Sequence, residues 1–137
     1  EMNLVVDSLI SIADPRLIKL VLKGEKVIGF AFVYPDLSDA IRRHKGKLHP
    51  LALFDLQREY KRTRWLIANG VGILPAYQNL GGDAVLYVDI WNTIRQLGQY
   101  EHVDVVEVNE INFASRSDME SLGIQWTKKH RSYTRKL

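Results

Sequence analysis

Apolar residues recur at two different spacings along the chain, and each spacing predicts a type of element. Near the amino end, helical spacing predicts a helix over 2–13, which ends before Pro15. Runs rich in leucine, isoleucine and valine predict a strand over 16–22 and its antiparallel partner over 27–34. Gly29 lies inside the second strand, where it indicates a bulge or the close approach of another backbone.

The segment 36–62 has a different character. Two short helices are expected there, at about 37–44 and 50–60. The second begins with Pro50, a residue favoured in the first turn of a helix.

The second half of the chain alternates strands and helices. The expected elements are a strand over 63–74, a helix over 82–98, a buried strand over 103–108, a helix over 112–122 and a last strand over 124–136. In the long helix, one apolar face is formed by Leu86, Ile90, Ile94 and Leu97. The order predicts a mixed α/β fold (α+β, one mixed sheet) in a single domain over 1–137, with a helical insertion at about 36–62.

The composition limits the classes of protein. A chain of 137 residues has the length of one domain with one core. It contains no cysteine, which excludes disulfides and thiolate sites, and its four histidines show no metal-ligand spacing. No apolar run approaches the ~20 residues of a membrane-spanning helix. We therefore expect a cytoplasmic protein with neither a metal nor a membrane partner.

The net charge of +3 at pH 7 suits an anionic ligand, whether a nucleotide, a cofactor phosphate or a nucleic acid. Basic residues gather in two segments, 42–64 and 128–136. Neither segment shows a recognised nucleic-acid-binding motif, so nucleic-acid binding is not expected.

The segment 75–82 lies where a strand ends and a helix begins, a setting that favours anions. The first N–H groups of a helix lack partners within it, and the helix dipole adds about half a positive charge there. Gly81 and Gly82 allow the backbone to approach a phosphate closely. The pattern predicts a phosphate-binding loop.

The sequence around this loop resembles the central motif of the GNAT (N-acetyltransferase) superfamily. Residues 73–81 read Ile-Leu-Pro-Ala-Tyr-Gln-Asn-Leu-Gly, with Gln78 in the family's Gln/Arg position and Gly81 in its first glycine position. Residues 112–124 resemble a later helix of the family, which begins Asn-x-x-Ala/Ser and ends in Leu-Gly-Phe.

The resemblance covers about residues 16–34 and 63–137, and it implies a GNAT-like acyl-CoA N-acyltransferase fold that lacks the first strand and helix. It also implies acetyl-CoA as co-substrate, with pantetheine along the strand before the loop and pyrophosphate on the loop amides. A backbone N–H near Gly72 or Ile73 is the family's usual oxyanion donor. The residues expected to bind the cofactor are Val71, Gly72, Ile73, Gln78, Asn79, Leu80, Gly81, Gly82, Asp83, Ala84, Asn112 and Ser115.

The chain departs from the family pattern in three places. Asp83 occupies the second glycine or alanine position, unless the pattern slips by one residue. Met119 stands where many members carry the tyrosine that protonates the leaving thiolate. The missing first strand predicts that the chain is a fragment of a longer one or is completed by an additional N-terminal domain. A homodimer also stays open.

Acetyl transfer to an amine proceeds by direct attack on the thioester, and it needs a base as well as positioning. For the base we expect Glu107, on the strand after the long helix, with Glu110 and His130 as alternatives. Tyr133, on the expected last strand, is the candidate donor of a proton to the thiol.

The insertion 36–62 is longer than the tight connection that GNAT members have at this point. One interpretation is a lid that shapes the acceptor pocket, with Tyr60 or His49 contributing. The other is a solvated insertion whose apolar side chains pack on the body of the domain. Those side chains are Leu51, Leu53, Phe54 and Leu56.

The sequence thus predicts an acetyl-CoA-dependent acyltransferase that N-acetylates a primary amine of a small molecule or peptide. The alternative is a catalytically degenerate acyl-CoA-binding or regulatory module, which Met119 and Asp83 favour.

Overall fold

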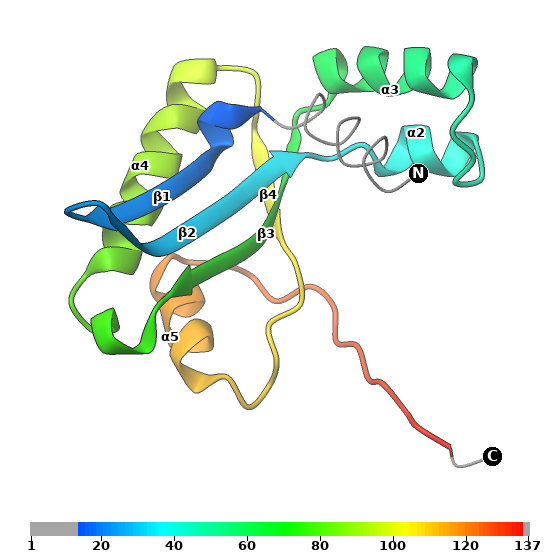
Figure 1. Ribbon diagram of the computed structural model, residues 1–137. Coiled ribbons are helices and arrows are strands. Elements are labelled where there is room, and N and C mark those ends of the chain that lie inside the picture. The colour runs from blue at the N-terminus through cyan, green and yellow to red at the C-terminus, as the bar shows by residue number, and fades with distance from the viewer. Residues whose placement is uncertain (1–13, 136–137) are drawn as a thin grey trace. The chain divides into compact units, whose positions relative to one another are not determined.

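A computed structural model describes residues 14–135 and divides the chain into two compact units, Glu1–Asp104 and Val105–Leu137. In chain order the elements are η1 (Pro15–Leu17), β1 (Ile18–Lys23), β2 (Lys26–Pro35), α2 (Ser38–Arg43), α3 (Pro50–Arg62), β3 (Trp65–Ile73), η2 (Pro75–Tyr77), α4 (Gly82–Leu97), β4 (His102–Val105) and α5 (Phe113–Ser121) (Figure 1). The expected helix over 2–13 lies outside the described residues. The mixed α/β fold around one sheet is confirmed, and the single domain stays a prediction.

The four strands form one sheet in the order β1-β2-β3-β4. β2 pairs antiparallel with both β1 and β3. Two shifts of register interrupt the pairing: Ile28 is the extra residue of β2 opposite β1, and Asn69 is the extra residue of β3 opposite β2. Such bulges bend a strand and raise its local twist.

Gly29 lies directly after the bulged Ile28, and the backbone approaches it closely. A Cβ atom at this position would lie 2.3 Å from Cδ1 of Ile73 and 3.0 Å from the carbonyl oxygen of Gly72. Both distances are shorter than ordinary van der Waals contacts, so a glycine is required unless its neighbours shift. The bulge and the close approach expected from the sequence are both found.

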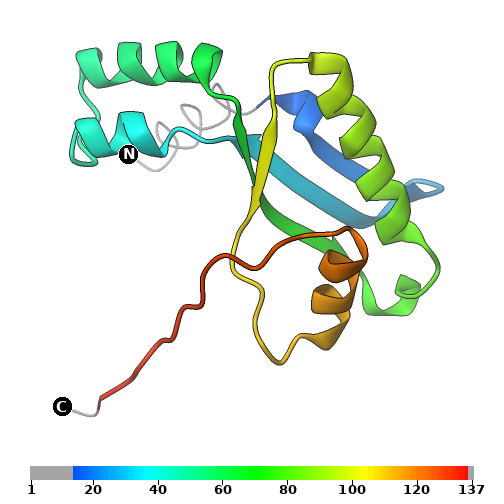
Figure 2. The same cartoon turned by 180° about the vertical axis from the view of Figure 1, so that it is seen from behind.

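α4 lies along one face of the sheet (Figures 1 and 2). The core beneath it consists of Leu17, Ala31, Val33, Leu66, Leu86, Ile90 and Ile94. This arrangement confirms the apolar face expected for the long helix, and Leu97 packs against the core as well. Lys19 also faces α4, where its ammonium group lies 2.8 Å from the carboxylate of Asp89 and 2.8 Å from the hydroxyl of Thr93.

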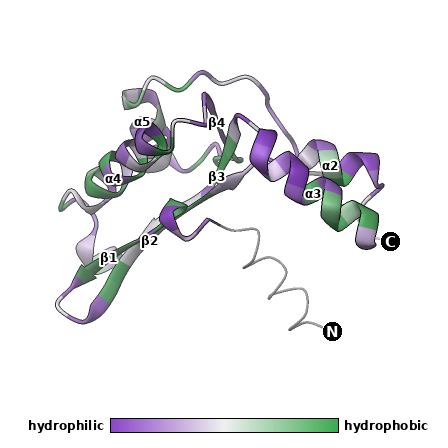
Figure 3. Cartoon of the chain, turned by 90° about the horizontal axis from the view of Figure 1, so that it is seen from above, coloured by the Kyte–Doolittle hydropathy of each residue, from purple (hydrophilic) through white to green (hydrophobic). Residues whose placement is uncertain are grey.

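The opposite face of the sheet carries large apolar side chains that are about half exposed. Because side chains alternate between the two faces of a strand, the residues next to the core positions of β1 point away from α4. The exposed set comprises Ile18, Leu20, Leu22, Val27, Phe30 and Trp65. Figure 3 shows hydrophobic residues along β1 and β2.

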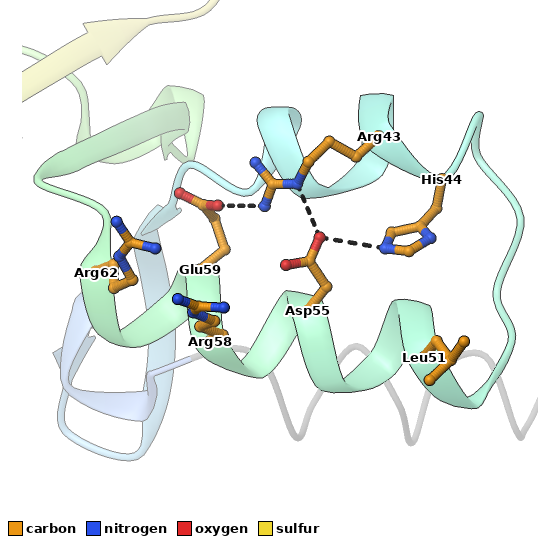
Figure 4. A pocket seen from close by; sticks show the side chains of 7 residues that line it. All are labelled: Arg43, His44, Leu51, Asp55, Arg58, Glu59 and Arg62. Carbon is orange, nitrogen blue, oxygen red and sulfur yellow. Dashed lines mark hydrogen bonds and ion pairs between the residues drawn. The ribbon is translucent and has the colours of Figure 1, made fainter.

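The two helices expected in the insertion are present as α2 and α3, and ion pairs hold them together (Figure 4). The guanidinium of Arg43 donates to the carboxylates of Asp55 and Glu59, at 2.9 and 2.6 Å. The imidazole of His44 lies 3.1 Å from the same Asp55 oxygen. Hydrogen bonding to Arg43 lowers the pKa of Asp55 and raises the pKa of Arg43.

The expected packing of the insertion on the body of the domain is not found: Leu56 is buried, but with Leu37 and Ala40 of the insertion itself. The other three side chains, Leu51, Leu53 and Phe54, are exposed, so their predicted burial is wrong. Two helices in contact bury only the narrow stripe where they meet, and these three side chains lie outside that stripe.

Hydrogen bonds join the end of the insertion to the segment between α4 and β4. The side-chain amide of Gln99 donates to the carbonyl oxygens of Tyr60 and Thr63, at 3.0 and 3.1 Å.

Asp14 is buried, and its carboxylate accepts from the backbone N–H and the guanidinium of Arg16. Hydrogen bonding from Arg16 lowers the pKa of Asp14 despite burial, which raises it.

The second unit departs from the sequence-based expectation. The described part of the expected strand over 124–136 contains no strand, and that prediction is wrong there. A strand needs a partner for its ladder, and closely spaced basic residues such as Lys128, Lys129 and Arg131 repel one another in an extended row. The expected strand over 103–108 is also shorter: β4 ends at Val105 and is mostly exposed, because β3 is its only described neighbour.

None of the helices in residues 14–135 combines the length and the apolar content that crossing a bilayer takes. In the same part of the chain, no three histidine or carboxylate side chains come together in a way that could hold a metal ion.

Candidate functional site

The candidate site begins where β3 leaves the sheet. The backbone N–H of Leu74 donates to the carbonyl oxygen of Ile28 on β2, at 2.8 Å. Because N–H groups alternate in direction along a strand, the N–H groups of Val71 and Ile73 point away from β2. That direction is toward the β4 side of the sheet.

β4 does not extend far enough to pair with this end of β3. The N–H groups of Glu101 and His102 donate to the carbonyl oxygen of Arg64, so β4 starts beside the start of β3 and runs parallel to it. β4 has 4 residues and β3 has 9. The edge of β3 at Val71 and Ile73 is therefore not covered by a described strand. An extended amide-containing chain can add to such an edge through main-chain hydrogen bonds.

Gly72 is also required by its surroundings. It lies opposite Phe30 of β2, and a Cβ atom on it would lie 2.8 Å from Cε1 of the Phe30 ring. The ring thus lies directly over the backbone of β3, on the face away from α4. Contact with the Phe30 ring explains why a glycine occupies this position of the expected pantetheine-binding strand. The sequence pattern alone does not show this reason.

After β3, the chain forms the short helix η2 and then the loop that leads into α4 (Figure 1). The side-chain amide of Gln78 donates to the carbonyl oxygen of Ile73 at 3.1 Å, which ties the beginning of the loop to the end of the strand. Asn79 and Gly81 adopt left-handed backbone conformations, with φ of 60° and 80°. Asparagine and glycine are the residues that tolerate this conformation best.

The amides of this loop are free to bind an anion. Within residues 14–135, none of the backbone N–H groups of residues 79–84 donates a hydrogen bond. The first hydrogen bond of α4 runs from the N–H of Val85 to the carbonyl oxygen of Gly81, at 3.1 Å. The positive end of the α4 dipole lies at the same amides, and the two together favour an anion. Leu80 and Ala84, two residues of this segment, are themselves exposed to solvent.

Asp83 lies in the first turn of α4 and is partly buried. Within the described residues it forms no ion pair, unlike Asp89 one and a half turns later, which binds Lys19. A carboxylate in the first turn stabilises the helix through its dipole. The same negative charge repels an anion on the adjacent amides.

Asn112 and Ser115 belong to the second unit, where they form the start of α5. The side-chain oxygen of Asn112 accepts a hydrogen bond from the backbone N–H of Ser115, at 3.2 Å, and so caps the helix. Asn112 is exposed, and Ser115 is partly buried one turn before Met119, the buried residue of α5.

The candidates for proton transfer are all in the second unit and are exposed. Glu107 follows the end of β4 and lies 4.0 Å from the imidazole of His130. Glu110 forms an ion pair with Lys129 at 3.2 Å. Tyr133 is 83% exposed and lies on no strand. The structure thus brings Glu107 near His130, two of the residues considered for the base, but it does not provide the strand expected to carry Tyr133.

Two cavities are lined by other residues, all of the first unit. An open cavity of about 500 Å³ on the α2–α3 hairpin is lined by Arg43, His44, Leu51, Asp55, Arg58, Glu59 and Arg62 (Figure 4). A smaller one, of about 250 Å³, lies at the end of α4 between Trp91 and Val103. In the first cavity the charged groups around Asp55 are already paired with one another. Neither cavity is lined by a residue of the loop 78–84.

The two residues proposed for a lid serve the insertion itself. The imidazole of His49 accepts from the N–H of Ala52 at the start of α3, at 3.4 Å. Tyr60 is partly buried at the other end of α3 and packs against its apolar stripe. Burial raises the pKa of the Tyr60 hydroxyl.

Two residues near the loop are missed by the sequence reasoning. Lys23 and Lys26 lie in a segment that reads as an ordinary turn, and their ammonium groups lie 5.1 and 5.7 Å from the ring centre of Tyr77. In the sequence, Lys-Gly-Glu-Lys predicts only a turn. That its lysines lie beside η2 follows from the register of the sheet.

No model of a known protein family matches the chain, and no curated protein sequence matches it. Solved structures match its fold. Aminoglycoside N-acetyltransferase AAC(6')-Iy in complex with CoA is 16% identical with a TM-score of 0.60, over 99% of this chain and 87% of that chain.

Two further structures agree. The apo 6'-N-acetyltransferase AAC(6')-IG from Acinetobacter haemolyticus is 16% identical with a TM-score of 0.57, over 99% of this chain and 79% of that chain. AAC(6')-Iy with the bisubstrate analog CoA-S-monomethyl-acetylneamine is 15% identical with a TM-score of 0.54, over 86% of this chain and 67% of that chain. The chain therefore has the fold of the GNAT acetyltransferases.

Proposed function

We propose that this protein is an acetyl-CoA-dependent N-acetyltransferase. The observation that carries the proposal is the combination of an unpaired strand edge with a loop of unpaired amides that directly follows it. The edge at Val71 and Ile73 suits the amide-containing pantetheine arm, and the amides of residues 79–84 suit the pyrophosphate. The order along the chain, edge first and anion site second, matches the order of these groups in CoA.

The same edge supplies the electrostatic part of the chemistry. The N–H groups of Val71 and Ile73 point away from β2 and are fixed by the strand, so one of them can donate to the thioester carbonyl as negative charge develops on it, while the other pairs with pantetheine. The amine attacks the thioester carbon directly, and a base accepts the proton that the attacking nitrogen loses. Glu107 is the proposed base, with Glu110 and His130 as alternatives.

The acceptor is proposed to be a primary amine of a small molecule or a peptide. Structures with the same fold include an enzyme bound to a bisubstrate analog of an acetylneamine and another bound to sisomicin, both of which are aminoglycoside acetyltransferases. They support a small-molecule amine as the first class to be tested. Together, residues 1–137 are proposed to act as one GNAT-like domain.

A second candidate is a catalytically degenerate acyl-CoA-binding module. Its support is the position of Met119, which is only 7% exposed and carries no dissociable proton. Tyr133, the other candidate proton donor, lies on no strand that could fix its position. In this case the protein binds acyl-CoA and releases it without transfer.

Thermal unfolding with acetyl-CoA, CoA and ADP tests binding. A rise in the unfolding midpoint is expected with both CoA species and a smaller one with ADP, because a ligand that binds only the folded state stabilises it. No rise with either CoA species at millimolar concentration would exclude the proposal. Release of free thiol in the presence of a panel of amines then separates the enzyme from the degenerate module, which would bind CoA without turnover.

A further inference from the structure

The tip of the β1–β2 hairpin holds two lysines beside the entrance to the loop. Lys23 and Lys26 face each other as the last pair of the hairpin register. Both ammonium groups lie within cation–π distance of Tyr77, at 5.1 and 5.7 Å from its ring centre. Tyr77 is the last residue of η2 and directly precedes Gln78. One aromatic ring therefore holds two positive charges at the edge of the anion-binding loop.

This pair of lysines is not balanced by the protein. Like charges directly opposite each other on antiparallel strands are destabilising. In the described part of the chain, neither ammonium group forms an ion pair, whereas Lys19 of the same strand binds Asp89 at 2.8 Å. The Tyr77 ring is the contact that both ammonium groups have, but it carries no negative charge. A pair of like charges without a neutralising negative charge is typical of a binding site, in which the ligand supplies the opposite charge.

The fold fixes the lysines to the same end of the sheet as the loop. Gly29, near the start of β2, lies opposite Ile73 at the end of β3, and the N–H of Leu74 donates to the carbonyl oxygen of Ile28. The hairpin tip thus projects beyond the last residue of β3, next to η2. The lysines and the loop amides therefore lie on the same part of the protein surface, where one ligand can contact both.

The chemistry of the two sets of donors differs. Backbone amides carry only partial charges, and they suit the singly charged oxygens of a pyrophosphate diester. Two full positive charges suit a phosphate monoester, which carries about −1.5 to −2 at pH 7. We propose that Lys23 and Lys26 bind the 3′-phosphate monoester at the adenosine end of CoA. This inference rests on the proposed function, because it takes CoA as the ligand of the loop.

Binding of CoA and of dephospho-CoA, measured by titration calorimetry, tests the assignment. The two ligands share pantetheine and pyrophosphate, and only CoA carries the 3′-phosphate. The unaltered protein should bind CoA more tightly. In the double variant Lys23→Gln/Lys26→Gln, CoA affinity should fall about tenfold or more, since charge-assisted hydrogen bonds to phosphate are lost. The affinity for dephospho-CoA should stay within about twofold.

The matched control is Lys47→Gln/Lys61→Gln, which removes the same charge from exposed lysines of the α2–α3 hairpin and its loop. It should leave the ratio of the two affinities unchanged. A second readout is the free energy of unfolding without ligand, which should stay the same or rise in Lys23→Gln/Lys26→Gln, because a repulsion is removed.

Equal losses for CoA and dephospho-CoA, or an unchanged CoA affinity, would overturn the assignment of the 3′-phosphate. Weak but equal binding of both ligands by the unaltered protein would overturn it as well, while leaving CoA binding intact. Failure of the proposed function looks different, because the unaltered protein would then bind neither ligand.

Discussion

The side-chain amide of Gln78 is hydrogen-bonded to the carbonyl oxygen of Ile73, so the first residue of the loop is tied to the last residue of β3. This contact makes Gln78 a positioning residue for the amides that follow it. The side chain holds the turn around η2 closed, and it does so from an exposed position.

Replacement of Gln78 by alanine should weaken CoA binding by about three- to tenfold, because one hydrogen bond that orders the loop is lost. Gln78→Glu should act in the same direction, since a carboxylate cannot donate to a carbonyl oxygen. Titration calorimetry measures both. Gln57→Ala, on the exposed side of α3, is the matched control. An affinity unchanged in Gln78→Ala would show that the loop is ordered without this bond.

Gly81→Ala should destabilise the protein by roughly 1–2 kcal/mol, because φ is 80° at this position and a left-handed conformation strains any residue with a Cβ atom. No atom lies within 4 Å of the added Cβ, so the strain is conformational and not steric. The variant should also bind CoA more weakly. Denaturant unfolding and calorimetry measure the two effects.

Gly46→Ala provides the control, because it has the same kind of strain, φ of 73° with open space around it, in the α2–α3 connection. Its loss of stability should be similar, with CoA affinity unchanged. If both variants lost the same CoA affinity, the weaker binding of Gly81→Ala would result from its lower stability alone.

Gly29→Ala should destabilise the protein by about 1–3 kcal/mol, the usual range for overpacking. The new Cβ atom meets Cδ1 of Ile73, an atom that valine lacks. Ile73→Val in the same chain should therefore restore part of the loss. Denaturant unfolding of the two single variants and the double variant gives the coupling energy. Strict additivity would contradict the close approach of β2 and β3 at this point.

Asp14 should contribute to stability at neutral pH and lose that contribution in acid. Its pKa is lowered in the folded state by hydrogen bonding from Arg16, so the unfolded chain binds the proton first. Stability should fall as the pH drops below about 4, the ordinary range of an aspartate. Asp14→Asn keeps the oxygen that accepts from the Arg16 N–H, and its unfolding free energy should depend less on pH in this range. Identical acid profiles would contradict the assignment.

The contribution of Tyr100 to stability should depend on pH in the opposite direction from that of Asp14. Burial raises its pKa to about 12. The unfolded chain loses this proton first, at about pH 10, so the contribution to stability is present below that pH and is lost as the pH rises toward the folded value. Tyr100→Phe should show a shallower loss of stability in this interval. Difference absorbance of tyrosinate between the two proteins locates the titration.

Much of the first unit was predictable, because its elements are specified by local pattern. Gly98 ends α4 in a left-handed conformation, and its N–H donates to the carbonyl oxygen of Ile94, as expected of a helix-ending glycine. Pro50 begins α3, and the apolar stripe of α4 is buried. In each case the residues that determine the element lie within a few positions of one another.

The rest depends on partners that a local pattern does not contain. The apolar run 103–108 yields only the short β4, since a strand extends no further than its ladder. The segment around Tyr133 has residues that strands favour, but no strand forms there. Likewise, Lys23 and Lys26 acquire a meaning only from the register that places them beside Tyr77.

The setting of the proposed anion site, a strand, a glycine-containing loop and a helix, was predictable in outline. Its open edge was not, because that edge results from the difference in length between β3 and β4. The proposed roles of Glu107, Tyr133, Asn112 and Ser115 depend on tertiary contacts in the second unit, and they stay predictions.

The contact of Gln99 with the end of α3 has a consequence for the order of assembly. The ion pairs between α2 and α3 join residues 12 and 16 positions apart, so this hairpin can form early from its own sequence. Gln99 is separated from Tyr60 and Thr63 by 39 and 36 positions, and it follows α4. Because contacts of longer sequence separation cost more loop-closure entropy, the contact of the hairpin with Gln99 is expected to form after the hairpin itself.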